Sequence, residues 1–244
     1  TRYDDHETFG GNASSRITAS YVLENTDTKF LANWGQGFRA PSISQLTFQC
    51  LTCVGVNETL DPERSTGYEF GIEQPLLNNR VTVSATYFRQ SVNDKITYVN
   101  FSEGYDNIDK TLSKGVEVNI KADVTDTLYV NANYTYTDAK DTTAGVNTPL
   151  VREPKHLISG SIQWAPTDKI ATSLLVTHNG AEFQKDVVLP LKGWTRVDLR
   201  ISYELMESLN VYARVDNVFN EEYQYVPGYG TADRSFFAGI RKTF

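Results

Sequence analysis

Apolar and polar residues alternate along almost the whole chain, and this alternation limits the possible folds more than any other feature. Between residues 130 and 137, for example, Val130, Ala132, Tyr134 and Tyr136 are separated by asparagine and threonine residues. A period of two residues is typical of a β-strand with one apolar face and one polar face. The pattern predicts roughly eleven strands, centred on residues 17–23, 30–34, 68–72, 81–87, 116–122, 128–136, 158–164, 170–176, 197–203, 209–215 and 232–244.

The connections between these segments alternate in length. Short turns are expected at residues 25–28, 76–79, 123–127, 165–168 and 206–208. Long polar segments follow at residues 35–62, 100–109, 138–154, 179–192 and 217–232. Such a hairpin rhythm predicts one all-β, antiparallel domain over residues 1–244, with short turns at one end and long loops at the other. No stretch with a helical period interrupts it.

Composition argues against a nucleic-acid-binding protein and a helical membrane protein, and it leaves two possible arrangements of the strands. The chain has 244 residues and a net charge of −7, which argues against nucleic acid as a partner. No apolar run approaches the ~18–20 residues of a membrane helix. The apolar faces therefore point either into the core of a soluble β-protein or outward into lipid, as in a membrane β-barrel.

Three features favour the membrane arrangement. The strands approach the ~10 residues that cross a bilayer when tilted. Aromatic residues gather near strand ends, where membrane interfaces favour them. Charged residues lie in mid-strand on the polar face, as Asp198 and Arg200 do, and a wide lumen would hydrate them. Burial of Asp198 and Arg200 together with exposure of Leu199 and Ile201 would decide for the membrane arrangement.

Catalytic motifs are missing, so the sequence predicts a protein that is not an enzyme. There is no nucleophile elbow, no phosphate-binding loop and no His-x-x-x-His pair. Asp4, Asp5 and His6 suggest a metal site at first sight, but this composition is more typical of a solvated loop start. Acidic side chains in the long loops, such as Asp138 and Asp141, leave a calcium site open. No covalently bound cofactor is expected.

The two cysteines, Cys50 and Cys53, lie within the segment 35–62. A zinc site would need further ligands, and a thioredoxin-type motif would need a βαβ context. We therefore expect a disulfide that staples the loop in an oxidising compartment.

Several motifs, in this order along the chain, resemble the TonB-dependent outer-membrane receptors. They are Gly37-Phe38-Arg39-Ala40-Pro41-Ser42, Leu60-Asp61-Pro62-Glu63-Arg64-Ser65, Tyr105-Asp106-Asn107 with Lys114-Gly115-Val116-Glu117, Asn133-Tyr134-Thr135-Tyr136-Thr137-Asp138-Ala139, Arg152-Glu153-Pro154-Lys155-His156, and Val215-Asp216-Asn217-Val218-Phe219-Asn220-Glu221-Glu222-Tyr223 followed by Pro227-Gly228-Tyr229, Arg234 and Phe244. The opening Arg2-Tyr3-Asp4-Asp5-His6 and the pair Gly228-Tyr229 look most like the vitamin B12 (cobalamin) receptor branch. Catecholate and other siderophore receptors follow closely.

The resemblance implies a 22-stranded transmembrane barrel with a plug in its lumen. This chain would supply about the last eleven strands, as a fragment without the plug domain. The implied function is TonB-energised uptake of cobalamin or a ferric siderophore through the outer membrane of a Gram-negative bacterium. The implied partners are outer-membrane lipid, the TonB complex through the plug, the barrel-assembly machinery and a small-molecule ligand. A passive porin or adhesin and a soluble β-rich binding module remain alternatives.

Ligand binding would fall to the long loops and the upper lumen. Phe48, Tyr225 and Tyr229 are the aromatic candidates there, because their rings can stack on a flat corrin or catecholate ligand. Tyr229 is the leading one, since it also matches the Gly-Tyr position in the last loop of the family.

The last strand ends on an aromatic residue. Phe236, Ala238, Ile240 and Phe244 share its apolar face and are expected to meet lipid, with Lys242 snorkelling to the headgroups. In the family, such a terminal aromatic is the signal read by the barrel-assembly machinery. The strand that Phe244 would pair with is expected to lie outside this chain.

Overall fold

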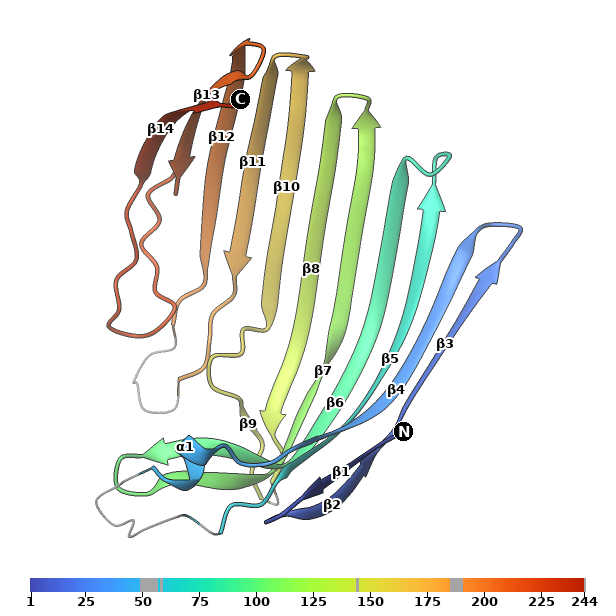
Figure 1. Ribbon diagram of the computed structural model, residues 1–244, viewed down its shortest axis with the longest axis vertical. Helices are drawn as coiled ribbons and strands as arrows, with labels where there is room; N and C mark the ends of the chain where they lie inside the picture. Colours follow the sequence, from blue (N-terminus) through green and yellow to red (C-terminus); the bar gives the residue numbers. More distant parts are fainter. Residues whose placement is uncertain (49–56, 58, 144, 185–190, 244) are drawn as a thin grey trace.

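Antiparallel strands make up most of this computed structural model, which describes residues 1–48, 57, 59–143, 145–184 and 191–243. They form one large curved sheet and a separate two-stranded hairpin, as Figure 1 shows. The hairpin consists of β1 (Arg2–His6) and β2 (Gly10–Ser14). A single short helix, α1 (Ile43–Leu46), lies among the described residues.

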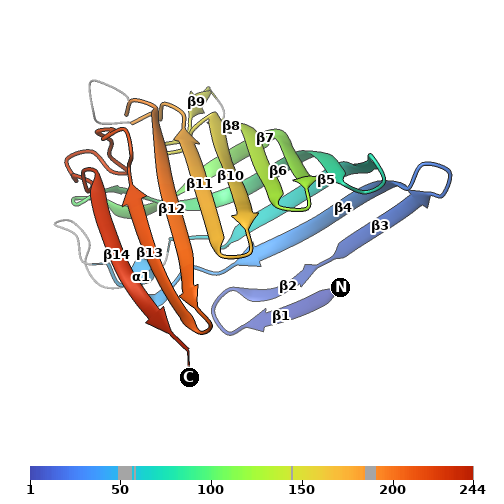
Figure 2. The same cartoon turned by 90° about the horizontal axis from the view of Figure 1, so that it is seen from above.

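Eleven strands follow one another across the large sheet, each paired antiparallel with its neighbours. They are β3 (Arg16–Leu23), β4 (Thr28–Arg39), β5 (Glu63–Leu76), β6 (Val81–Asn100), β7 (Gly104–Thr125), β8 (Leu128–Asp141), β10 (His156–Thr167), β11 (Ile170–Asn179), β12 (Trp194–Met206), β13 (Leu209–Asp216) and β14 (Ser235–Lys242). The short β9 (Thr148–Pro149) pairs with the end of β8. Seen from above in Figure 2, the strands form an open arc with β3 and β14 at its two edges.

These strands coincide one for one with the eleven expected from the alternation. The short turns also lie where they were expected, and together they form the short-turn end at the top of Figure 1. In the β5–β6 turn, Leu77, Asn78 and Asn79 all have a positive φ, between 53° and 66°. The other end, which we call the long-loop end, carries the remaining connections.

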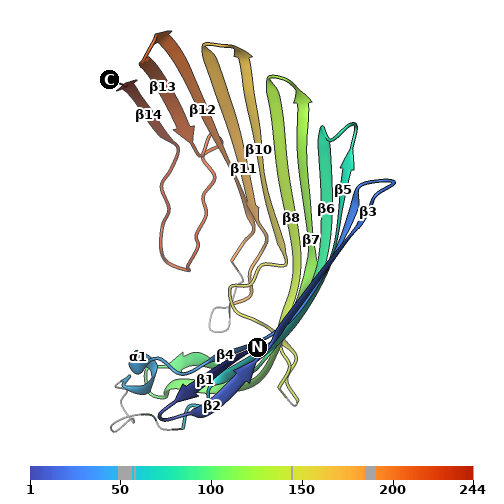
Figure 3. The same cartoon turned by 45° about the vertical axis from the view of Figure 1, so that its right-hand side comes forward.

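One predicted loop is wrong. Residues 100–109 continue the ladder as a long β6–β7 hairpin, in which Lys95 pairs with Ile108 and Tyr98 with Tyr105. Figure 3 shows this hairpin bending away from the rest of the sheet toward its concave side. The prediction failed because backbone pairing carries the hairpin past the point where its side chains stop alternating.

All eleven strands turn their apolar residues to the same side, which we call the apolar face. Phe30 is directly opposite both Tyr21 and Ile72, and at the other edge Val211 is opposite Ile240. Because directly opposed residues point to the same side of a sheet, these pairings join into one continuous surface. Phe236 and Ala238 extend it over β14, where they oppose Val215 and Ala213.

The apolar face has no second layer on it among the described residues. Leu199 and Ile201 are 41% and 45% exposed, whereas Asp198, on the opposite face, is 5% exposed. This is the inverse of a soluble β-protein and agrees with the membrane arrangement. Arg200 differs from the expectation, because it is exposed on the polar face. No helix in the described part of the chain is long and apolar enough to cross a membrane.

The opposite side, the polar face, is concave. A broad groove near the short-turn end is lined by its residues, among them Gln163, Arg200 and Arg214. Phe237 breaks the polar pattern of this face for a structural reason: the Arg214 guanidinium lies 4.1 Å from the centre of its ring. A cation over an aromatic face is an attractive contact, so Phe237 belongs on this side.

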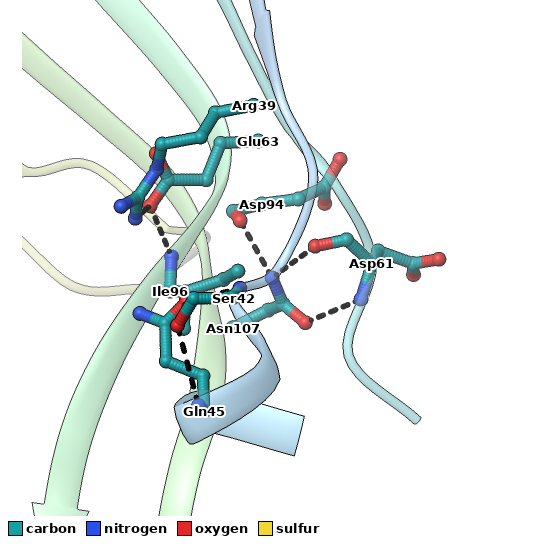
Figure 4. Close-up of polar contacts among 8 residues, drawn as sticks. All are labelled: Arg39, Ser42, Gln45, Asp61, Glu63, Asp94, Ile96 and Asn107. Carbon is teal, nitrogen blue, oxygen red and sulfur yellow. Dashed lines mark hydrogen bonds and ion pairs between the residues drawn. The ribbon is translucent and has the colours of Figure 1, made fainter. Parts of the chain in front are cut away.

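A polar cluster ties the end of β4 and the start of β5 to the β6–β7 hairpin (Figure 4). The Glu63 carboxylate accepts hydrogen bonds from Arg39 Nε and Nη2 at 2.8 and 2.6 Å, and from Ile96 N at 2.8 Å. The Asn107 side chain bonds both the N–H and the C=O of Asp61 and also the carbonyl of Asp94. Three of the motifs found in the sequence, which supply Arg39, Asp61 with Glu63, and Asn107, therefore hold the loops in place.

Candidate ligand-binding site

An aromatic and charged cluster lies on the polar face at the long-loop end, where the segment 217–234 folds back on β12. We call it the last-loop cluster and define it as Trp194, Arg196, Asp198, Tyr223 and Tyr225. The Trp194 ring centre is 4.4 Å from that of Tyr223 and 5.5 Å from that of Tyr225. The two tyrosine rings are 5.4 Å apart and nearly perpendicular. Trp194 is buried beneath them, so the tyrosines form the accessible part.

Arg196 links the aromatic part of the cluster to its acidic part. Its Nη1 donates to the Tyr223 hydroxyl at 2.9 Å, and its Nη2 is 3.1 Å from Asp198 Oδ2. Its Nε is buried and has no hydrogen-bond partner among the described residues. The guanidinium is thus held in place by Tyr223 and Asp198, and no described residue satisfies its buried Nε donor.

Asn217 fixes the path of the loop that carries the tyrosines. It has a φ of 55° and its N–H donates to Asp198 Oδ1 at 2.8 Å. Its side-chain amide bonds both the N–H and the C=O of Glu221, at 2.8 and 2.9 Å. Asparagine tolerates the left-handed region and imitates a backbone turn in this way, which explains its place in the motif.

Tyr225 keeps its proton in this setting. Partial burial raises the pKa of Tyr225 above its ordinary value, and the adjacent Tyr223 adds to the rise. The phenol therefore stays neutral at physiological pH and remains able to donate a hydrogen bond to an anionic ligand.

A second aromatic group lies across the long-loop end, around Phe48. Its ring centre is 5.6 Å from that of Tyr98, 5.5 Å from that of Tyr105 and 6.4 Å from that of Phe101, each nearly edge-on. The hydrogen bond from Asn57 Nδ2 to the Tyr105 carbonyl, 3.1 Å long, joins the same loop to β7. This group packs the loop onto the hairpin, and its outer edges are open to solvent.

The three aromatic residues predicted from the sequence therefore fall in three different places. Tyr225 belongs to the last-loop cluster, and Phe48 belongs to the group on the β6–β7 hairpin. Tyr229 is 72% exposed, and its N–H bonds the carbonyl of Val226 within the loop. The sequence missed Trp194, Arg196 and Tyr223 as a group, although the alternate spacing of Trp194, Arg196 and Asp198 placed them on one face.

The structure gives less information on the other predicted sites. Cys50, Cys53 and Phe244 lie outside the described residues. No group of three or more His, Cys, Asp or Glu residues is placed to hold a metal ion in the described ranges. Asp138 instead pairs with Lys140 at 3.1 Å, and Asp141 Oδ1 accepts the N–H of Thr143 at 2.9 Å. These contacts give no support to a calcium site at Asp138 and Asp141, which the sequence had left open.

Comparison with known proteins gives a family match over most of the chain. The model of the family described as "TonB dependent receptor-like, beta-barrel" matches residues 1–218. This range includes β1 to β13 and the last-loop cluster as far as Asp198.

Solved structures share the fold at low sequence identity. The ferric-catecholate import receptor Fiu from E. coli K12 is 19% identical, with a TM-score of 0.77 over 96% of this chain and 35% of its own. A mutant of the ferric enterobactin receptor PfeA from Pseudomonas aeruginosa, in complex with enterobactin, is 21% identical, with a TM-score of 0.80 over 99% of this chain and 42% of its own. The copper transporter OprC is 16% identical, with a TM-score of 0.78 over 95% of this chain and 40% of its own. The chain thus spans about two fifths of the length of these proteins.

Proposed function

Because the chain belongs to the TonB-dependent receptor-like β-barrel family, we propose that it forms part of the wall of an outer-membrane receptor that imports a ferric siderophore. The apolar face would meet lipid and the polar face would line the lumen. The long-loop end would face the outside of the cell, since outer-membrane barrels keep their short turns in the periplasm. The eleven strands would be half of a 22-stranded barrel.

The last-loop cluster is the observation that carries the proposal. A ferric siderophore of the catecholate class presents flat aromatic rings and a net negative charge. Tyr223 and Tyr225 offer ring faces and edges for stacking, and Arg196 offers a guanidinium held at the lumen wall. Asp198 orients this guanidinium through its ion pair with Nη2.

The choice among ligands follows from the same chemistry. Fiu and PfeA are named for ferric catecholate and ferric enterobactin, whereas OprC is named for copper. Cobalamin, which the opening segment and Gly228-Tyr229 suggested, has no counterpart among these three. Two accessible tyrosine rings beside one arginine suit an anionic aromatic chelate better than a bare copper ion, which prefers sulfur and imidazole ligands.

Coupling to the TonB complex through a plug domain, and assembly through the last strand, belong to the same proposal. Assembly through the last strand is supported by the unbroken apolar stripe that this edge strand presents, formed by Phe236, Ala238 and Ile240. A passive porin is the alternative, and the two differ in energy dependence. Uptake by the proposed receptor stops when TonB is deleted, whereas uptake by a porin continues.

The test is a binding panel on the complete receptor that carries this chain. A ferric tris-catecholate, a ferric hydroxamate and cyanocobalamin are titrated against the wild type, Tyr225→Ala and Tyr21→Ala. Tyr21 is an exposed tyrosine of the apolar face and serves as the control. We expect the tris-catecholate to bind most tightly and Tyr225→Ala alone to weaken it several-fold. Preference for cyanocobalamin, or equal binding by both variants, would overturn the proposed ligand.

A further inference from the structure

A row of cations lies on the apolar face just beyond its aromatic edge, at the long-loop end. On β6, Tyr87 is followed on this face by Arg89, and on β7 Val116 is followed by Lys114. On β8, Tyr136 is followed by Asp138 and then by Lys140. We call Arg89, Lys114 and Lys140 the cation row.

Register brings the members of the row together. Arg89 and Lys114 are directly opposite each other on β6 and β7, and Lys114 is directly opposite Asp138 on β8. Directly opposed side chains have Cβ atoms only about 4.5–5.5 Å apart, and like charges in such a pair repel each other. The Arg89–Lys114 pair therefore sets two like charges against each other, and in the register of the described strands Asp138 is the one carboxylate opposite either of them.

The single acidic neighbour is already engaged. Asp138 pairs with Lys140 at 3.1 Å, and its side chain is 16% exposed. Arg89 and Lys114 are exposed and form no ion pair within the part of the chain that the structure describes. Two neighbouring cations thus point away from the sheet without an internal anion.

The row marks one end of the apolar face only. At the short-turn end, the same three strands place Val81, Ala122 and Val130 in register on this face. On β10 and β11, the apolar face approaches the row with His156, which is opposite Tyr136, and with His178, which is opposite Ile158. Their Nδ1 atoms are 2.9 Å from the Tyr134 hydroxyl and 2.8 Å from Thr195 Oγ1. The positive charge is therefore concentrated on β6, β7 and β8.

We propose that Arg89 and Lys114 bind a phosphate group on the headgroup of an outer-leaflet lipid. The inference rests on the proposed function only in that the apolar face lies in the outer membrane with its long loops outside. Tyr87 and Tyr136 then lie at the interface, where aromatic residues collect, and the cation row lies at headgroup depth. A phosphate there removes the repulsion between the two cations and gains two charge-assisted hydrogen bonds.

The test uses the complete receptor, delipidated in detergent and studied by native mass spectrometry. Bisphosphorylated lipid A and the same lipid with both phosphates removed are titrated in parallel. We expect the wild type to prefer the phosphorylated lipid. The variant R89Q/K114Q should lose about thirtyfold in that affinity, because each of the two cations near a lipid surface contributes about 1 kcal/mol. The matched control R80Q/K121Q changes one arginine and one lysine that lie off the apolar face.

Each outcome decides for or against the site. Equal binding of the two lipids by the wild type overturns it without any variant, even if R89Q/K114Q fails to assemble. An equal loss in R80Q/K121Q would show only a general charge effect, which also overturns it. Millimolar inorganic phosphate should not compete with the lipid, and full competition would show a free-anion site instead. Ferric siderophore binding is measured on the same samples, so failure of the proposed function would appear there and leave the lipid result separate.

Discussion

The apolar face and the polar face are made by the same eleven strands, yet different interactions hold each of them. The apolar face is a set of directly opposed side chains with no partner layer, and Phe236 and Ile240 are 72% and 71% exposed on it. The polar face has its own internal contacts, such as Arg196 with Asp198 and Arg214 over Phe237. The apolar face therefore depends on its surroundings for stability, whereas the polar face depends on specific pairs. Neighbouring residues on one strand belong to opposite faces. Substitutions at adjacent positions can therefore measure the contribution of each face to stability separately.

The largest effect is expected for a charge placed in the middle of the apolar face. In the complete receptor, refolded into liposomes, Leu199→Arg should reduce the free energy of unfolding by about 2–4 kcal/mol, the cost of arginine near the bilayer midplane. Gln163→Arg, on the polar face, is the control and should stay within about 1 kcal/mol, since the lumen hydrates the new charge. Urea titration measures both, and equal losses would show that the two faces meet the same solvent.

The residue next to Leu199 tests the polar face. Asp198→Ala removes the acceptor for Asn217 N and leaves Arg196 without its carboxylate, so a loss of about 2–3 kcal/mol is expected. Asp216→Ala breaks the more exposed pair with Arg214, at 3.0 Å, and should lose less than about 1 kcal/mol. Asp198→Ala should also weaken ferric siderophore binding through Arg196. A variant as stable as wild type would show that the last-loop cluster is not held by Asp198.

Close packing between strands gives a smaller effect. A Cβ on Gly115 would lie 1.8 Å from the Tyr136 carbonyl oxygen and 2.7 Å from the Phe88 ring, so Gly115→Ala should destabilise the barrel by about 1–3 kcal/mol. At Gly35, the nearest atom to a Cβ is 3.7 Å away, which makes Gly35→Ala the control with little change. The same urea titration compares them, and an unchanged Gly115→Ala would contradict the tight β7–β8 approach.

The smallest effect concerns the two neighbouring phenylalanines of β14. A double-mutant cycle between Arg214→Met and Phe237→Leu should show a coupling energy of about 0.5–1 kcal/mol, the usual size of a cation–π contact. The cycle of Arg214→Met with Phe236→Leu should show none, because Phe236 lies on the apolar face. Coupling of similar size in both cycles would mean that the face assignment of β14 is wrong.

The strands of the sheet could be predicted from the sequence because the period of two residues is a property of each strand alone. All eleven strands and the five short turns could be predicted in this way. The β6–β7 extension could not, since Lys95 and Ile108 face each other through backbone pairing that no alternation marks. The last-loop cluster was also out of reach, because Tyr223 meets Trp194 only after Asn217 turns the chain. The cation row was visible only after the register had placed Arg89 opposite Lys114.

The most direct test of which face meets lipid is a nitroxide scan of residues 197–203 in the complete receptor, reconstituted in liposomes, with Cys50 and Cys53 replaced by serine. Collision rates with oxygen report contact with lipid, and collision rates with a water-soluble nickel chelate report contact with water. With the apolar face in lipid, we expect oxygen maxima at Val197, Leu199, Ile201 and Tyr203, and chelate maxima at the alternate positions. Oxygen maxima at Asp198, Arg200 and Ser202, or no period of two in either rate, would contradict a barrel wall with its apolar face in lipid.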